Sequence, residues 1–266
     1  HPNETRVVLK SNGNIEDYEY ESLKSTLIKN NIYLGKVSRV EPSLQAAFID
    51  FGRERHGFLS FNDIQSDYYQ IPQNDLDKIK QEEEKAREEL IKESEKEEEK
   101  NILDNKVDID SSVEKKTDYS SNSEKNNIEK KYPFKRYKIQ EVIKPNQVIL
   151  VQVLKDERGM KGAALSTFIS IAGKYIVLMP NTPKGGGISR KIFNPSDRKK
   201  IRNILNEIII PSDMGIIVRT AGSNKTKNEI ESDLENLIKV WNAIKENAMN
   251  SIAPSMIHQE SDVIKR

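Results

Sequence analysis

The sequence predicts an α+β protein, in which a small closed barrel of five strands, interrupted by a long charged insertion, is followed by a mixed α/β domain. Three observations predict this fold. Short strand-like runs separated by turn residues fill much of the first part of the 266-residue chain, a low-complexity charged stretch interrupts them, and a long helical periodicity appears towards the end. Strands followed by helices are typical of the α+β class.

Five runs rich in β-branched and aromatic residues predict the barrel. Turn residues separate them, for example Pro42 with Ser43, and Arg158 with Gly159. The OB-fold is a five-stranded barrel of this kind, and the face formed by its second and third strands binds oligonucleotides. The five runs are residues 31–40, 44–51, 55–61, 147–156 and 161–170.

The charged insertion covers residues 74–131. It holds 19 acidic and 13 basic residues and few aromatic ones. Such a composition cannot bury enough apolar surface to offset the entropy of ordering the chain, so we expect a disordered or partly helical segment within the barrel domain. The rest of the chain carries seven more basic than acidic residues, which is compatible with a polyanionic partner.

The pattern changes to mixed α/β after residue 172. Residues 174–180 and 215–222 are strand-like, residues 181–191 predict a glycine-rich loop, and residues 195–208 predict a helix. A second helix is predicted by apolar residues spaced three and four apart, which we expect to be core rather than site. These residues are Ile230, Leu234, Leu237, Ile238, Trp241, Ile244 and Ala248.

Several functional classes are excluded within this chain. Without cysteine there is no disulfide, no thiolate zinc site and no cysteine nucleophile. The longest apolar runs are far shorter than the ~20 residues of a membrane helix, and no phosphate-binding GxxxxGK[ST] motif is present. We expect a cytoplasmic protein without a membrane span, and a chain that is an excised piece of a longer one.

Two phenylalanines on neighbouring predicted strands, Phe48 and Phe58, are candidates for stacking on nucleic-acid bases. The alternative places both rings inside the barrel. Basic residues on and beside these strands could form a rim that faces phosphates, or could be an ordinary solvated surface. They are Lys36, Arg39, Arg53, Arg55, Lys155 and Lys161.

Arg219 and Thr220 end the strand-like run VRTAG, where an arginine fork and a hydroxyl could grip a phosphate. The alternative is an arginine paired with a surface carboxylate. A basic cluster in the same part of the chain could follow an RNA backbone or could be a soluble helix face. It comprises Arg190, Lys191, Arg198, Lys199, Lys200 and Arg202.

Evidence for a metal site is weak. Asp50, Asp156 and Glu157 are the carboxylates nearest the expected nucleic-acid face and could bind magnesium, but they lack a paired-carboxylate spacing. The three histidines, at positions 1, 56 and 258, are too far apart in sequence to suggest a metal or catalytic set.

Four long segments lie outside the insertion: NIYLGKVSRVEPSLQAAFIDFGRERHGFLSF, DERGMKGAALSTFISIAGKYIVLMPNTPKGGGISRKI, GIIVRTAG and APSMIHQESDVI. Together they resemble the N-terminal portion of the bacterial ribonuclease E/G family. The resemblance implies an endoribonuclease of RNA processing and decay that cleaves single-stranded RNA and senses a 5′-monophosphate. It also implies partial ribonuclease-H-like strands (1–30), an OB-fold RNA-binding domain (31–169), a 5′-sensor domain (170–253) and a truncated ribonuclease-H-like segment (254–266).

Carried over by position, the resemblance assigns two groups of residues. It implies that Arg219, Thr220, Val177 and Gly173 bind the 5′-phosphate, and that Phe48, Phe58 and Lys161 bind RNA. The family's catalytic aspartates, which hold Mg²⁺, and its zinc-linking cysteines lie in later domains. We therefore expect neither catalytic nor metal-binding residues in this chain, which should bind RNA without cutting it, and a homotetramer for the full-length protein.

Two other functions remain open from the sequence. The chain could be a stand-alone RNA-binding module without end-sensing, in which case VRTAG and GGGISRK would have no use. It could also be a scaffold whose acidic insertion recruits a protein partner.

Overall fold

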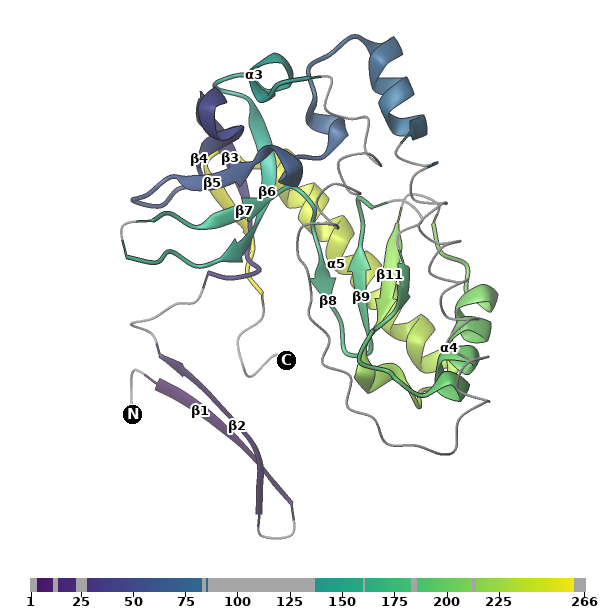
Figure 1. Ribbon diagram of the computed structural model, residues 1–266. Coiled ribbons are helices and arrows are strands. Elements are labelled where there is room, and N and C mark those ends of the chain that lie inside the picture. The colour runs from purple at the N-terminus through teal and green to yellow at the C-terminus, as the bar shows by residue number, and fades with distance from the viewer. Residues whose placement is uncertain are drawn as a thin grey trace, which may run out of the picture. The chain divides into compact units, whose positions relative to one another are not determined.

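The computed structural model describes residues 4–11, 14–22, 28–82, 85, 137–159, 161–182, 186–211 and 214–260. It divides into two compact units (Figure 1). The barrel unit comprises His1–Gln65, Lys144–Ser170 and Lys239–Arg266, and the α/β unit comprises Ser66–Ile143 and Ile171–Ile238. The predicted α+β class, with a barrel and a mixed α/β part, is confirmed.

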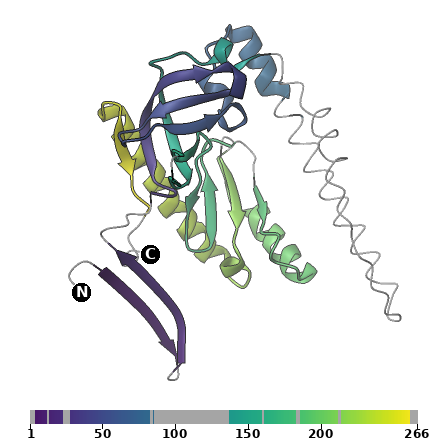
Figure 2. The same ribbon diagram turned by 60° about the vertical axis from the view of Figure 1, so that its left-hand side comes forward.

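The barrel is a closed sheet in the order β3-β4-β5-β7-β6, which closes because β6 also pairs with β3. All neighbours are antiparallel except β5 and β7, which are parallel. The closed, strongly curved sheet is visible in both views (Figures 1 and 2). The strands are β3 (Ile32–Glu41), β4 (Ala46–Asp50), β5 (Gly57–Ser60), β6 (Val148–Lys155) and β7 (Ala164–Ser166).

Alternation along the strands places one set of side chains inside the barrel. The fully buried residues include Val37, Ile49, Leu59, Val151 and Leu165, one from each strand.

Glycines allow the backbone segments of the barrel to approach at the tightest points. A Cβ on Gly57 would collide with the Leu165 side chain, and one on Gly162 would collide with the carbonyl oxygen of His56. The barrel therefore depends on small residues at these crossings.

A sixth strand, β12 (Ser255–His258), pairs antiparallel with β3 at the edge of the barrel sheet. This strand lies within residues 254–266, which the resemblance implies to be a truncated ribonuclease-H-like segment. Beyond it, the backbone N–H of Glu260 donates to the side-chain oxygen of Asn31 over 2.9 Å. Residues 261–266 lie outside the described part of the chain.

The N-terminal strands form a two-stranded antiparallel hairpin of β1 (Glu4–Ser11) and β2 (Asn14–Ser22). Strands are therefore present within residues 1–30, where the resemblance implies them. The ribonuclease-H-like character of this segment and the boundaries of the expected domains stay predictions.

The α/β unit contains a four-stranded sheet in the order β10-β11-β9-β8. Its strands are β8 (Ile171–Ala172), β9 (Ile176–Met179), β10 (Gly186–Ile188) and β11 (Gly215–Val218). The stretch 181–191 was expected to be a loop throughout. Three of its residues instead form β10, because Gly186 to Ile188 pair in parallel with β11.

Two main helices follow the predicted patterns. α4 (Pro195–Glu207) begins after Asn194, whose side-chain oxygen accepts a 3.1 Å hydrogen bond from the backbone N–H of Ser196. α5 (Lys227–Asn250) buries Ile230, Leu234, Leu237, Trp241 and Ile244 of the expected stripe. These residues are core, as expected.

The short elements are α3 (Ile139–Val142), the 3₁₀ helices η1 (Pro42–Leu44), η2 (Phe61–Asp63), η3 (Ser66–Tyr68) and η4 (Thr220–Gly222), and a helix over residues 73–82. This last helix covers the start of the predicted insertion at 74–131. Apart from Lys85, the rest of the insertion, including most of its expected helix, lies outside the described residues. Among the helices that the structure describes, none has both the length and the apolarity to cross a membrane.

Candidate nucleic-acid interface

Arg219 joins two loops at one end of the α/β unit. It follows β11 in extended conformation, and its backbone N–H donates to the carbonyl oxygen of Tyr175 over 2.8 Å. Its guanidinium donates to the carbonyl oxygen of Gly173 over 2.7 Å. No other acceptor for the guanidinium is found among the described residues, so most of its five N–H donors face outward.

The carboxylate of Asp233 on α5 fixes the loop that Arg219 contacts. It accepts backbone N–H bonds from Lys174 (3.3 Å), Tyr175 (2.8 Å) and Ile176 (3.1 Å). Three N–H bonds to one carboxylate hold the loop against α5 and present the Gly173 carbonyl to Arg219. The sequence interpretation missed Asp233. The available signal was a carboxylate between Ile230 and Leu237, within the apolar stripe of the helix.

The loop leaves no room for a side chain at Gly173. A Cβ there would lie 2.8 Å from Asp233 Oδ2 and 2.8 Å from Leu237 Cδ1. The turn is closed by a 2.8 Å bond from the Gly173 N–H to the carbonyl oxygen of Ile176. Glycine is therefore required by packing, and its role in a phosphate site stays a prediction.

The other two residues expected to bind the 5′-phosphate lie in the same unit. Thr220 is exposed at the start of η4, directly after Arg219. Val177 is half-buried on β9, opposite Ala172 on β8 and Ile217 on β11. The structure thus brings Arg219, Thr220 and Gly173 to adjoining loops, with Val177 on the strand that follows the Gly173 loop.

Two lysines that the sequence interpretation missed lie beside these loops. The ammonium nitrogens of Lys174 and Lys225 lie 5.3 Å and 4.9 Å from the centroid of the half-buried Tyr175 ring. Lys225 also donates to Glu229 over 3.2 Å. The Glu229 hydrogen bond, with a smaller contribution from Tyr175, raises the pKa of Lys225, so Lys225 carries its charge at neutral pH.

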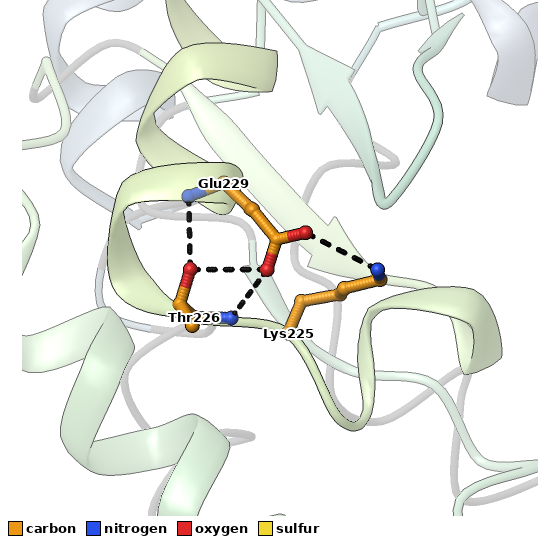
Figure 3. Close-up of polar contacts among 3 residues, drawn as sticks. All are labelled: Lys225, Thr226 and Glu229. Atoms are coloured by element: carbon orange, nitrogen blue, oxygen red, sulfur yellow. Dashed lines mark hydrogen bonds and ion pairs between the residues drawn. The ribbon is translucent and has the colours of Figure 1, made fainter.

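Glu229 also caps the start of α5 (Figure 3). Its carboxylate accepts from the Thr226 backbone N–H and hydroxyl, each over 3.0 Å, while the Thr226 hydroxyl oxygen accepts from the Glu229 N–H over 3.4 Å. This is a capping box. Bonds from Thr226 and then Lys225 lower the pKa of Glu229. The box fixes the chain that carries Lys225.

The barrel carries a separate aromatic surface. Phe48 and Phe58 are directly opposite each other on β4 and β5, with ring centroids 6.1 Å apart and planes at 76°. Phe48 is half-buried and Phe58 is 37% exposed, while Ala47, Ile49 and Leu59 beside them are fully buried. The structure therefore rules out the alternative that both rings fill the barrel interior.

Arg39 completes this surface, with its guanidinium carbon 4.5 Å from the centroid of the Phe48 ring. Lys161 is exposed in the loop before β7, where it forms an isolated bridge with Arg158. Arg55 donates to the carbonyl oxygen of Gly159 and so ties the two loops of the barrel together. Of the other expected rim residues, Arg53 and Lys155 are exposed and Lys36 is half-buried.

One member of the basic cluster around α4 has a structural role within the protein, and others are exposed to solvent. Arg198 donates to the carbonyl oxygens of Ser189 (3.3 Å) and Ile192 (3.2 Å), which makes it a structural residue. Arg190, Lys191, Lys199 and Lys200 are exposed.

Two of the three acidic residues considered for magnesium, Asp50 and Asp156, have structural partners. Asp50 accepts from the Gly52 N–H over 3.1 Å, and Asp156 accepts from the Ile28 N–H over 3.0 Å. Within the described ranges, no three His, Cys, Asp or Glu side chains come together in a way that could hold a metal ion. The described residues thus offer no set that fits the Mg²⁺ or Zn²⁺ that the resemblance implies for the full-length protein, and the expectation for the whole chain stays a prediction.

The described part of the chain thus contains an OB-like barrel and an α/β unit, each with its own candidate surface. Residues 170–266 match a family model described as the Ribonuclease E/G family. Ribonuclease E of Escherichia coli (strain K12) is 38% identical over 99% of this chain, and ribonuclease E of Buchnera aphidicola subsp. Schizaphis graminum is 36% identical over 99%. Ribonuclease G of E. coli is 28% identical over 92% of the chain.

The chain belongs to the ribonuclease E/G family. It spans 19% and 21% of the length of the two ribonuclease E relatives and 38% of ribonuclease G. Among solved structures, the Staphylococcus aureus RNase P protein matches 27% of this chain and 79% of its own at 24% identity, with a TM-score of 0.23, which is too low to support an argument.

Proposed function

We propose that this chain is the RNA-recognition part of a single-strand-specific endoribonuclease of RNA processing and decay, and that it binds a 5′-terminal monophosphate on its α/β unit. The relatives named ribonuclease E and ribonuclease G support the enzyme class. Hydrolysis, with its Mg²⁺ and the linking Zn²⁺, belongs in this proposal to parts of the full-length protein outside this chain, as does homotetramer assembly. A cytoplasmic setting is part of the same proposal.

The observation that carries the phosphate proposal is the fixed position of Arg219. Its backbone and guanidinium are both bonded to the Gly173–Tyr175 loop, so the outward N–H donors are oriented before a ligand arrives. A guanidinium fork matches two oxygens of one phosphate, and the adjacent Thr220 hydroxyl can donate a further bond. Such a site favours one terminal phosphate over a hydroxyl end.

The barrel surface supplies the remaining RNA contacts in this proposal. The Phe48 and Phe58 rings present edges and faces on which bases can stack, and stacking on aromatic rings tolerates any sequence. Arg39 and Lys161 add positive charge for the backbone. Recognition of unpaired bases would confine binding to single-stranded RNA, because paired bases are already stacked.

The test compares one short single-stranded RNA carrying a 5′-monophosphate with the same RNA carrying a 5′-hydroxyl, at fixed salt. We expect the chain to prefer the phosphate by roughly 1 to 3 kcal/mol, as for a charge-assisted contact, and Arg219→Ala to abolish the preference. Arg190→Ala, which removes the same charge from an exposed position of the α/β unit, is the matched control and should keep the preference. Equal binding of both RNAs by the unmodified chain would contradict the proposal.

A second candidate, a plain RNA-binding module without end-sensing, is favoured by the exposed Phe48–Phe58 pair alone. It predicts that both RNAs bind equally and that only barrel variants weaken binding. The same measurement therefore separates the two functions.

A further inference from the structure

Two loops of the α/β unit meet beside Arg219 and carry additional positive charge. The first, residues 173–176, is fixed by Asp233 through three backbone bonds. The second, residues 219–226, is tied to the first by the bond from the Arg219 N–H to the Tyr175 carbonyl and is anchored at its far end by the capping box of α5. Lys174 lies on the first loop and Lys225 on the second.

Both ammonium groups lie near the ring of Tyr175. Both lie about 5 Å from the centroid of its ring, within the range of a cation–π contact. Like charges held near one ring repel each other, and an anion that binds both would offset this repulsion. The ring holds the lysines in place without neutralising them.

Neighbouring carboxylates satisfy this charge only in part, because Glu229 forms an ion pair with Lys225 alone. The oxygens of Asp233 are taken by backbone N–H groups, and Glu229 accepts one bond from Lys225, which leaves its ammonium with two further N–H donors. Lys174 is exposed, and no carboxylate partner for it is found in the part of the chain that the structure describes. Arg219 and the two lysines carry three positive charges, of which Glu229 balances one.

We infer that Lys174 and Lys225 form a second phosphate subsite, which takes the internucleotide phosphate that follows the 5′-terminal nucleotide. This inference rests on the proposed function and extends the same site. The next negative charge on an RNA strand held at Arg219 is this phosphodiester. Lysine suits it, because a compact ammonium on a flexible stem binds a single-charge diester as a point charge and needs no fork geometry.

The test uses the full 266-residue chain and a six-nucleotide RNA with a 5′-monophosphate. One version has a neutral methylphosphonate at the first linkage, another has it at the fourth linkage, and the reference has neither. The Lys174→Gln/Lys225→Gln variant is compared with Lys227→Gln. Lys227 is a matched control, because it has a similar exposure (38% against 35% for Lys225) and an i,i+4 glutamate, but contacts Glu207 and Glu231 and not Tyr175.

We expect neutralising the first linkage to weaken binding about three- to tenfold in the unmodified chain and in Lys227→Gln, with no further loss in the double variant. Neutralising the fourth linkage should change the RNA affinity by the same factor in all three proteins. The inference is overturned if the first-linkage substitution has no effect on the unmodified chain, or if it weakens the double variant by the same factor.

Failure of the proposed function can be distinguished from failure of the second phosphate subsite. If the unmodified chain binds 5′-phosphate and 5′-hydroxyl versions of the RNA equally, the terminal phosphate site itself is wrong. If that preference persists but the lysine and linkage effects multiply independently, only the second subsite is wrong.

Discussion

The carboxylate of Asp233 and the backbone N–H of Tyr175 are joined by a 2.8 Å hydrogen bond across 58 residues of sequence. With the bonds from Lys174 and Ile176, it holds the loop whose Gly173 carbonyl orients Arg219. A residue that need not touch RNA thus sets the geometry of the proposed phosphate site.

Asp233→Ala should therefore weaken end recognition and stability together. It leaves three N–H groups without their acceptor, and a hydrogen bond to a charged group contributes about 1.5 to 3 kcal/mol, so we expect a loss of at least about 2 kcal/mol in the free energy of unfolding. Urea titration measures this loss, and the ratio of 5′-phosphate to 5′-hydroxyl RNA affinities measures the site. Glu235→Ala, which changes an exposed residue on the same helix, should alter neither the free energy of unfolding nor the affinity ratio. Unchanged stability of Asp233→Ala would show that the loop keeps its conformation without the Asp233 hydrogen bonds.

Gly173→Ala tests the same contact by displacing the Asp233 carboxylate instead of removing it. The new methyl group would press on both Asp233 Oδ2 and Leu237 Cδ1, so the carboxylate must shift from its three donors. We expect the preference for a 5′-phosphate to fall as in Asp233→Ala. In the double variant the two losses should not add, because they act through one contact. Additive losses would mean that Gly173 acts independently of Asp233.

The sequence predicted the five barrel strands because alternation and turn residues are local signals. It could not decide which way Phe48 and Phe58 point, since a shift of one residue in register exchanges the two faces of a strand. The structure settles this through the full burial of Ile49 and Leu59. A glycine run hid β10, because its strand character comes only from pairing with β11.

The proposed phosphate site was predictable only in part. Arg219 and Thr220 were candidates from their chemistry in VRTAG and from the resemblance, whereas Asp233, Tyr175 and Lys225 depend on contacts between loops that are far apart in sequence. Periodicity showed the apolar stripe of α5 but not that a carboxylate within it would hold a distant loop.

Three phenylalanines of the barrel should separate RNA binding from stability. Phe58→Ala and Phe48→Ala should each weaken binding of single-stranded RNA by about 1 to 3 kcal/mol, because each removes a stacking ring. Phe58→Ala should leave the fold intact, since that ring is partly exposed. Phe51→Ala should cost about 3 to 5 kcal/mol of stability, because Phe51 is 1% exposed and packs edge-on against Tyr33. RNA titration and thermal unfolding on the same samples give both quantities.

The pair Phe48 and Phe58 should also show coupling. Since the rings contact each other, the double variant should lose less RNA affinity than the sum of the single losses. If both single variants bind RNA like the unmodified chain, RNA uses another surface of the barrel.

His258 gives the barrel unit a dependence on pH. It lies on β12 opposite Ile32, and burial lowers its pKa, so the folded chain favours the neutral ring. In the unfolded chain the ring takes up a proton as the pH falls through about 6.5. The unfolded state then binds more protons than the folded state, so stability decreases as the pH falls from about 7.5 towards 5 and does not depend on this group at higher pH. The glutamine side chain of His258→Gln cannot titrate, so the free energy of unfolding of this variant should fall less over that range.

Urea titrations at pH 8, 7, 6 and 5 measure this difference. The variant His56→Gln, which changes an exposed histidine, is the control for losing a histidine. Parallel pH profiles for His258→Gln and the unmodified chain would show that His258 does not control the acid sensitivity of this strand.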